Sequence, residues 1–187
     1  IDSAERTPGG DFRVGDMEAL PWEASSFNTV TAFSTSQFAA NAGNALREAT
    51  RVARNDAQVV VAVPGPPEDS ELAPFIMALR PLMPEPQPGM APNKGPFALS
   101  EPGKIEELLR EAGLTPMNAG TVDCPMEFPD EETLLLGMLA AGPAVLAIQN
   151  AGEDKVRTAA LRSLAPFRNA SGGYRLENTF HYHIATT

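Results

Sequence analysis

The sequence predicts an α/β fold in which a mostly parallel sheet has helices on both faces. Three observations carry this prediction. The run from Val59 to Val63 is apolar at every position, as in a strand that is covered on both sides. A pattern of helical period over 44–54 precedes it, and residues 27–33 form a β-branched and aromatic run typical of a strand. The order strand, helix, strand is the unit from which parallel sheets are built.

The elements before this unit are short. Residues 11–16 alternate apolar and polar side chains before Gly15, which predicts a short strand that runs into a turn. Leu20, Pro21 and Trp22 then supply a loop before the strand at 27–33. The helix at 44–54 ends at an Asn-Asp turn, after which the strand at 58–63 begins.

The middle of the chain predicts two further helices and one strand. Apolar spacing over 72–79 indicates a helix, and the proline and glycine residues of 81–96 predict a mobile loop. Ser100 is expected to cap a helix that Gly113 ends. A strand is expected at 115–123.

The last third combines helices with a final strand. Asp130 is expected to cap a helix over 130–142 whose leucines lie around much of its circumference, so it needs cover on several sides. A further helix is expected near 153–165. Strict alternation over 174–184 predicts one half-buried final strand.

Composition limits the partners. A net charge of -10 over 187 residues, with a pI near 4.6, disfavours binding to nucleic acid. The most hydrophobic stretch, 134–148, is interrupted by Gly142 and Pro143, so no membrane span is expected. Cys124 is the only cysteine, which suits the reducing cytoplasm and predicts a small buried side chain rather than a nucleophile. We expect a small-molecule partner and leave a homodimer open.

Two blocks in the first half of the chain carry a family resemblance. The segments 12–22 and 25–30 resemble the central motif of the methyltransferase type 11 family, which belongs to the class I S-adenosylmethionine-dependent methyltransferases and includes quinone-biosynthesis methyltransferases. The segments 45–52 and 100–114 resemble later parts of the same family. The resemblance covers nearly all of the first 115 residues.

The resemblance implies a Rossmann-like sheet whose last strand is antiparallel, with the cofactor across the carboxyl ends of the strands. Asp16 and Met17 would lie against the adenine of S-adenosylmethionine, and Ser34 would line its methionine end. Asp2, as a strand-end carboxylate, would accept hydrogen bonds from the ribose hydroxyls. Alternatively, Asp16 only caps a turn and Asp2 only ends a strand.

The chain departs from the family pattern at its beginning. The family's first strand and glycine-rich loop would precede Ile1 and are missing from this chain, and residues 3–10 leave no room for the usual helix after Asp2. We predict one methyltransferase-like domain over 1–187. Residues 1–64 form its cofactor-binding part, 65–100 and 124–170 are lid or substrate-cap insertions, and 171–187 hold the final strand.

Three other side chains have a functional and an ordinary interpretation. Trp22 covers the adenine or fills a gap in the core, and the second interpretation is favoured. His181 and His183 share one face of the final strand, but without a third ligand they predict a polar face and not a metal site. No side chain stands out as a catalytic base.

The expected reaction is therefore methyl transfer from S-adenosylmethionine to a small-molecule O, N or C nucleophile, of class EC 2.1.1, with S-adenosylhomocysteine as product. The first alternative is a non-catalytic, methyltransferase-like regulatory or assembly module. The second is a nicotinamide-dependent oxidoreductase, since the same strand-helix-strand unit binds dinucleotides.

Overall fold

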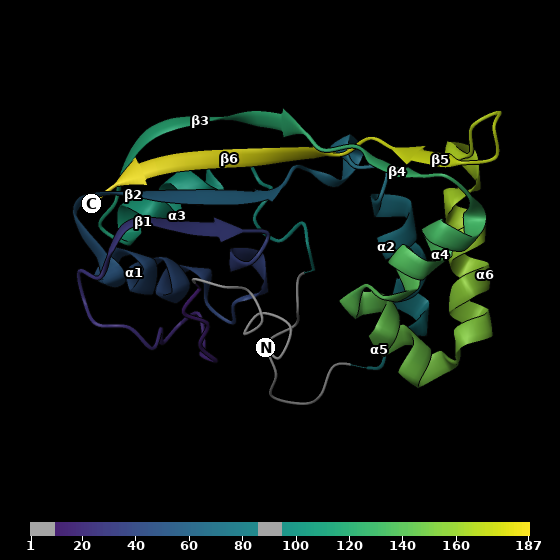
Figure 1. The fold of residues 1–187 in the computed structure, drawn as a ribbon, viewed down its shortest axis with the longest axis horizontal. Coiled ribbons are helices and arrows are strands. Elements are labelled where there is room, and N and C mark those ends of the chain that lie inside the picture. Colours follow the sequence, from purple (N-terminus) through teal and green to yellow (C-terminus); the bar gives the residue numbers. More distant parts are fainter. Residues whose placement is uncertain (1–9, 86–94) are drawn as a thin grey trace. The chain divides into compact units, whose positions relative to one another are not determined.

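The computed structural model describes residues 10–85 and 95–187. Two units are distinguished by their contacts (Figure 1). Unit 1 comprises Ile1–Val63, Asn93–Gly120 and His181–Thr187, and unit 2 comprises Pro64–Pro92 and Thr121–Phe180. Each unit has a hydrophobic cluster of its own, with Leu46 and Val59 in the first and Phe75 and Leu134 in the second. The assignment of 1–187 to one methyltransferase-like domain with two insertions stays a prediction.

Unit 1 is built on a four-stranded sheet of order β1-β2-β6-β3. Strands β1 and β2 are parallel, with Val30 opposite Val59 and Ala32 opposite Val61. The arrow of β6 runs opposite to those of β1 and β2 in Figure 1, so the sheet is mixed and its last strand is antiparallel. The elements are β1 (Phe27–Phe33), the 3-10 turn η1 (Ser36–Phe38), α1 (Ala42–Val52), β2 (Ala53–Pro64), α3 (Lys104–Glu111), β3 (Thr115–Asp123) and β6 (Thr179–Thr186).

The two helices of unit 1 cover one face of this sheet, which corrects the expectation of helices on both faces. Val59, Val61 and Val63 of β2 are at most 1% exposed and cluster with the apolar side chains of α1 and α3. Because alternate residues of a strand point to opposite faces, Ala62 and its β1 partner Phe33 lie on the other face. Phe33 is 60% exposed, so no described helix covers it.

Residues 11–16 do not form the predicted strand. They are irregular apart from an isolated bridge between Asp16 and Ala19. The alternation was therefore misleading, because a strand also needs a neighbour to take its backbone hydrogen bonds.

The residues that cap α1 and α3 differ in how well the local sequence predicts them. Asn41 caps α1 by accepting a hydrogen bond from the Asn44 amide. The expected Ser100 cap of α3 is wrong, because Gly103 holds the cap position with φ of 80° and the Ser100 hydroxyl donates to the Phe97 carbonyl instead. Gly113 does follow the end of α3, in the left-handed conformation with φ of 84°.

The described residues of unit 2 form four α-helices that pack against a two-stranded sheet. Strands β4 and β5 are antiparallel. Asp130 caps α4 as predicted, accepting from the Thr133 amide at 2.7 Å. The elements are the 3-10 turn η2 (Pro67–Asp69), α2 (Ala73–Leu79), η3 (Arg80–Leu82), β4 (Met126–Phe128), α4 (Glu131–Leu139), α5 (Gly142–Ala151), α6 (Glu153–Leu164), η4 (Ala165–Phe167) and β5 (Tyr174–Leu176).

The final strand predicted over 174–184 is two strands. β5 pairs with β4, whereas β6 joins the four-stranded sheet. Asn178 lies at the break, where its side-chain oxygen accepts hydrogen bonds from the Ser70 hydroxyl and the Leu72 amide. These bonds satisfy the side-chain oxygen of a buried residue.

Two further findings concern the surface. Cys124 is exposed, so the expectation of a buried thiol is wrong. Within the described residues no single helix is long and apolar enough to cross a membrane, although α4 and α5 together meet that test as a pair bent by 85°.

Candidate functional site

The carboxyl ends of the parallel strands β1 and β2 lie at one edge of the sheet, where open α/β sheets bind their ligands. Ser34 follows β1 directly, and its amide donates to the Ala62 carbonyl of β2 at 2.8 Å. Its backbone is left-handed, with φ of 51°, which is unusual for a residue other than glycine. The chain therefore turns sharply here and presents an exposed serine at the edge.

The 3-10 turn η1 comes next and carries two buried polar side chains, Ser36 and Gln37. The Gln37 Nε2 group donates to the Ser34 hydroxyl at 3.0 Å. No described residue donates a hydrogen bond to the Gln37 Oε1 atom, although this atom is buried. The edge thus holds an oriented amide whose acceptor end lacks a donor.

Asp16 begins a tight turn ahead of β1. Its carbonyl accepts from the Ala19 amide at 3.0 Å, and its Oδ1 atom accepts from the Glu18 amide at 2.9 Å. One carboxylate oxygen therefore has the turn-capping role that the sequence analysis kept as an alternative. The side chain is exposed, and Met17 beside it is half-buried.

Glu18 fastens this turn to the start of α1. Its Oε1 atom accepts from the Asn41 amide at 2.9 Å, and its Oε2 atom accepts from the Asn44 Nδ2 group at 3.0 Å. Since α1 starts at the edge where β1 ends, the Asp16 turn lies at that edge as well. The structure thus brings Asp16, Met17 and Ser34 to one edge of unit 1, while Asp2 lies outside the described residues.

Glu48 and Arg51 of α1 hold the segment that follows the turn. The Glu48 Oε2 atom accepts from the Leu20 amide at 2.8 Å. Arg51 donates to the Leu20 and Trp22 carbonyls at 3.0 and 2.9 Å, and it also bonds the Glu48 carboxylate. The segment therefore runs along α1 from its beginning at the ligand edge toward its end.

The charges of this pair favour their ionised forms. Hydrogen bonding to Arg51 holds the pKa of Glu48 below its ordinary value, although partial burial opposes this. Hydrogen bonding to Glu48 likewise raises the pKa of Arg51. Both groups are thus charged at neutral pH, and their bonds to the backbone are charge-assisted.

Trp22 packs within the same segment. Its ring meets Phe27 edge to face with centroids 5.6 Å apart, and the Arg13 guanidinium lies 5.4 Å from the ring centroid. These contacts are those of a packing residue, the interpretation that the sequence favoured.

The sequence did not indicate Glu18, Glu48, Arg51 or Gln37 as residues of this site. Three of these act through contacts 23 to 31 residues apart, which no local pattern indicates. A signal existed for Glu48 and Arg51, because opposite charges three residues apart in a helix face the same side. Gln37 had no signal beyond its place after a strand.

His183 is buried on β6, with its Nδ1 atom 3.4 Å from the Glu106 Oε1 atom of α3. Burial lowers the pKa of His183, and the nearby Glu106 opposes this shift. His181 lies half-buried on the same strand. In the described part of the chain, no three His, Cys, Asp or Glu side chains are grouped to hold a metal ion.

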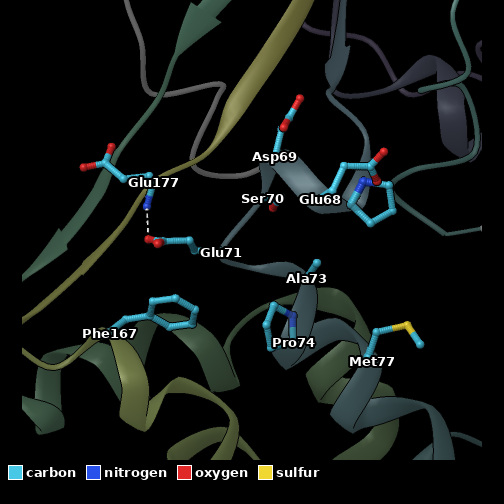
Figure 2. A pocket seen from close by; sticks show the side chains of 10 residues that line it. Glu68, Asp69, Ser70, Glu71, Ala73, Pro74, Met77, Phe167 and Glu177 are labelled. Carbon is cyan, nitrogen blue, oxygen red and sulfur yellow. Dashed lines mark hydrogen bonds between the residues drawn. The ribbon is translucent and has the colours of Figure 1, made fainter.

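Unit 2 contains a hollow of about 570 Å³ beside the start of α2. Figure 2 shows Glu68 and Asp69 on one side of it and Phe167, Pro74 and Met77 on the other. Glu71 is held in place, since its side chain accepts a hydrogen bond from the Glu177 amide at 2.6 Å. The hollow combines an acidic rim with an apolar floor.

A comparison with sequence models of protein families matches residues 2–61 to the methyltransferase domain of the type 11 family. By this match, the first third of the chain resembles the methyltransferase type 11 domain. The match spans the Asp16 turn, Ser34, η1, α1 and most of β2, which are the parts that build the ligand edge. The resemblance given by the sequence is thereby confirmed. A comparison with curated protein sequences gives no match.

Solved structures show that the chain shares its fold with proteins assigned as methyltransferases. An Anaeromyxobacter dehalogenans protein assigned as a type II methyltransferase superposes with a TM-score of 0.56 at 14% identity, over 97% of this chain and 73% of its own. The YcgJ protein of Bacillus subtilis gives 0.55 at 16% identity, over 92% and 69%. A Bacillus halodurans protein assigned as a methyltransferase gives 0.52 at 12% identity, over 92% and 75%.

Proposed function

We propose that this chain is a methyltransferase, which binds S-adenosylmethionine where β1 and β2 of unit 1 end and transfers its methyl group to a small-molecule acceptor. The observation that carries the proposal is the pair of bonds from Glu18 to the start of α1, which brings the Asp16 turn to the edge that Ser34 and η1 occupy. A carboxylate, an apolar side chain and polar side chains thus meet where such sheets bind ligands.

The residues of this edge fit the cofactor chemically. Among the described residues, only the Glu18 amide bonds the Asp16 carboxylate, at Oδ1, so we assign the Oδ2 atom to the exocyclic amine of the adenine. Met17 offers an adaptable apolar surface beside it. The exposed Ser34 offers a hydroxyl group for the polar end of the ligand. When bound, the cofactor supplies a methyl group on a positively charged sulfur.

The chain's own contribution is binding and alignment. Methyl transfer forms a bond from the acceptor's nucleophilic atom to the methyl carbon while the carbon–sulfur bond breaks, and its electron pair stays on the sulfur. Any proton on an acceptor O or N passes to solvent. Holding two reactants in line by itself lowers the barrier by several kcal/mol, about 7 to 11 in well-aligned systems, so no catalytic base is assigned.

The test is calorimetric titration of S-adenosylmethionine and S-adenosylhomocysteine into the full chain, with Asp16→Ala beside it and Asp154→Ala as the control. Asp154 is an exposed carboxylate in the first turn of α6 in unit 2. We expect binding that weakens at least tenfold in Asp16→Ala and does not change in Asp154→Ala. If the folded wild-type chain binds neither ligand, the non-catalytic module becomes the better account.

Four expectations stay predictions. They are a small-molecule methyl acceptor, a homodimer, a cytoplasmic location and the role of residues 65–100 and 124–170 as lid or substrate cap. The single cysteine and the acidic composition support a reducing compartment and a small-molecule acceptor.

A further inference from the structure

We infer that Gln37 is a specificity-determining residue whose side-chain oxygen receives an N–H or O–H of the methyl acceptor. The inference rests on the proposed function, since it places an acceptor at the same edge of unit 1. The residue was not among the site residues that the sequence indicated. Three observations lead to it: its burial, its missing donor and the way its other end is held.

The first two observations concern the energetic cost of a buried, unpaired hydrogen-bond acceptor. Gln37 is 4% exposed, and no described residue donates to its Oε1 atom. A buried acceptor without a donor destabilises the folded state, and folded proteins contain few such groups. A functional role is one explanation for a buried polar group in this state.

The third observation concerns orientation. The Gln37 Nε2 group donates to the Ser34 hydroxyl at 3.0 Å, so the Oε1 atom points away from Ser34. Ser34 is itself fixed by its amide bond to the Ala62 carbonyl and by its left-handed backbone. The free oxygen is thus held in one direction by a neighbour that is held by the sheet, as in sites organised before the ligand arrives.

The chemistry of the atom selects the partner. An amide oxygen is a neutral acceptor and takes no proton at neutral pH, so it orients a donor without acting as a base. An acceptor that is methylated on nitrogen or oxygen carries such a donor on the reacting atom. A hydrogen bond from this atom to Gln37 directs the lone pair elsewhere, and it favours N–H and O–H nucleophiles over carbon.

The acceptor is unidentified, so the test uses two ligands that differ at the transfer position. S-adenosylhomocysteine lacks the transferred group, whereas sinefungin carries an amine where S-adenosylmethionine carries the methyl group. Both are titrated into the wild-type full chain, Gln37→Met and the control Gln58→Met. Gln58 lies exposed on β2, so the control makes the same substitution away from the edge.

We expect Gln37→Met to lose at least tenfold in sinefungin affinity while S-adenosylhomocysteine affinity changes less than twofold, with no change of either in Gln58→Met. If Gln37→Met lost equal affinity for both ligands, Gln37 would bind a part of the cofactor that both ligands share, and the inference would be overturned. Unchanged sinefungin affinity in a folded Gln37→Met variant would overturn it too. Gln37→Ala gives the same test if methionine does not fit.

The wild-type titration separates this inference from the proposed function. If the wild-type chain binds neither ligand, the cofactor site itself fails, and the inference fails with it. If the wild-type chain binds both ligands and the Gln37 variants do not show the selective loss of sinefungin affinity, the inference alone is wrong.

Discussion

Removing the Glu48 carboxylate should loosen the segment that carries the Asp16 turn. Glu48 accepts from the Leu20 amide at 2.8 Å and bonds Arg51, with its side chain 19% exposed. A hydrogen bond to a charged group is worth about 1.5–3 kcal/mol, whereas an ion pair whose partner is 37% exposed adds little. We therefore expect Glu48→Ala to lower the free energy of unfolding by about 2 kcal/mol, mainly through the Leu20 amide.

The assay is urea unfolding followed by Trp22 fluorescence. Trp22 is the only tryptophan and lies within the segment that Glu48 and Arg51 hold, so its signal reports this part of unit 1. Glu107→Ala is the control, because Glu107 pairs with Lys104 at the same spacing on an exposed surface of α3, and its loss should leave the transition unchanged. Equal transitions in Glu48→Ala and wild type would refute the reasoning.

Two further predictions concern pH and packing. Because burial holds the pKa of His183 below 6.5, the unfolded chain binds the proton more readily, so stability is full above pH 6.5 and decreases as the pH falls below it. Unfolding at pH 7.5 and 5.5 should show this loss, reduced in His183→Gln despite the opposing Glu106 and the nearby His181; an equal loss in the variant would contradict the assignment. Gly173→Ala should destabilise unit 2 by more than about 1 kcal/mol, since an added Cβ atom would lie 2.7 Å from the Phe128 carbonyl. Loss of amide protection in β4 and β5 by hydrogen exchange checks this, and unchanged protection would exclude the clash.

Elements with a strong local pattern were predictable. The strands at 27–33 and 115–123 have the predicted bounds, and α4 begins at its Asp130 cap. Their signals are short-range, since β-branched runs and caps depend on neighbouring residues. The helix α5 was missed although Pro143 in its first turn is a common starting signal.

Features that depend on contacts between distant segments, such as strand pairing and helix cover, could not be predicted from local patterns. The alternation over 174–184 does not reveal that β5 and β6 pair in different sheets, because pairing is decided by segments far along the chain. The apolar run of β2 predicted cover on both faces, yet α1 and α3 share one face.

The candidate site likewise contains residues that a local motif predicts and residues that depend on distant contacts. Asp16, Met17 and Ser34 came from a motif that extends over neighbouring residues, and the structure places them at one edge of unit 1. The side chains that bring them there, Glu18 and Glu48, act across 23 to 28 residues. Their role follows only from the folded structure, in which residues 16–22 lie along α1.

The central claim is that the Asp16 turn and the residues after β1 form one ligand edge. Hydrogen exchange of the full chain with and without S-adenosylhomocysteine tests it most directly. The account predicts slower exchange at 16–20 and 34–38 together when the ligand is bound, and unchanged exchange in α4 and α6. Protection confined to unit 2, or binding with no protection at either of the two segments, would contradict it.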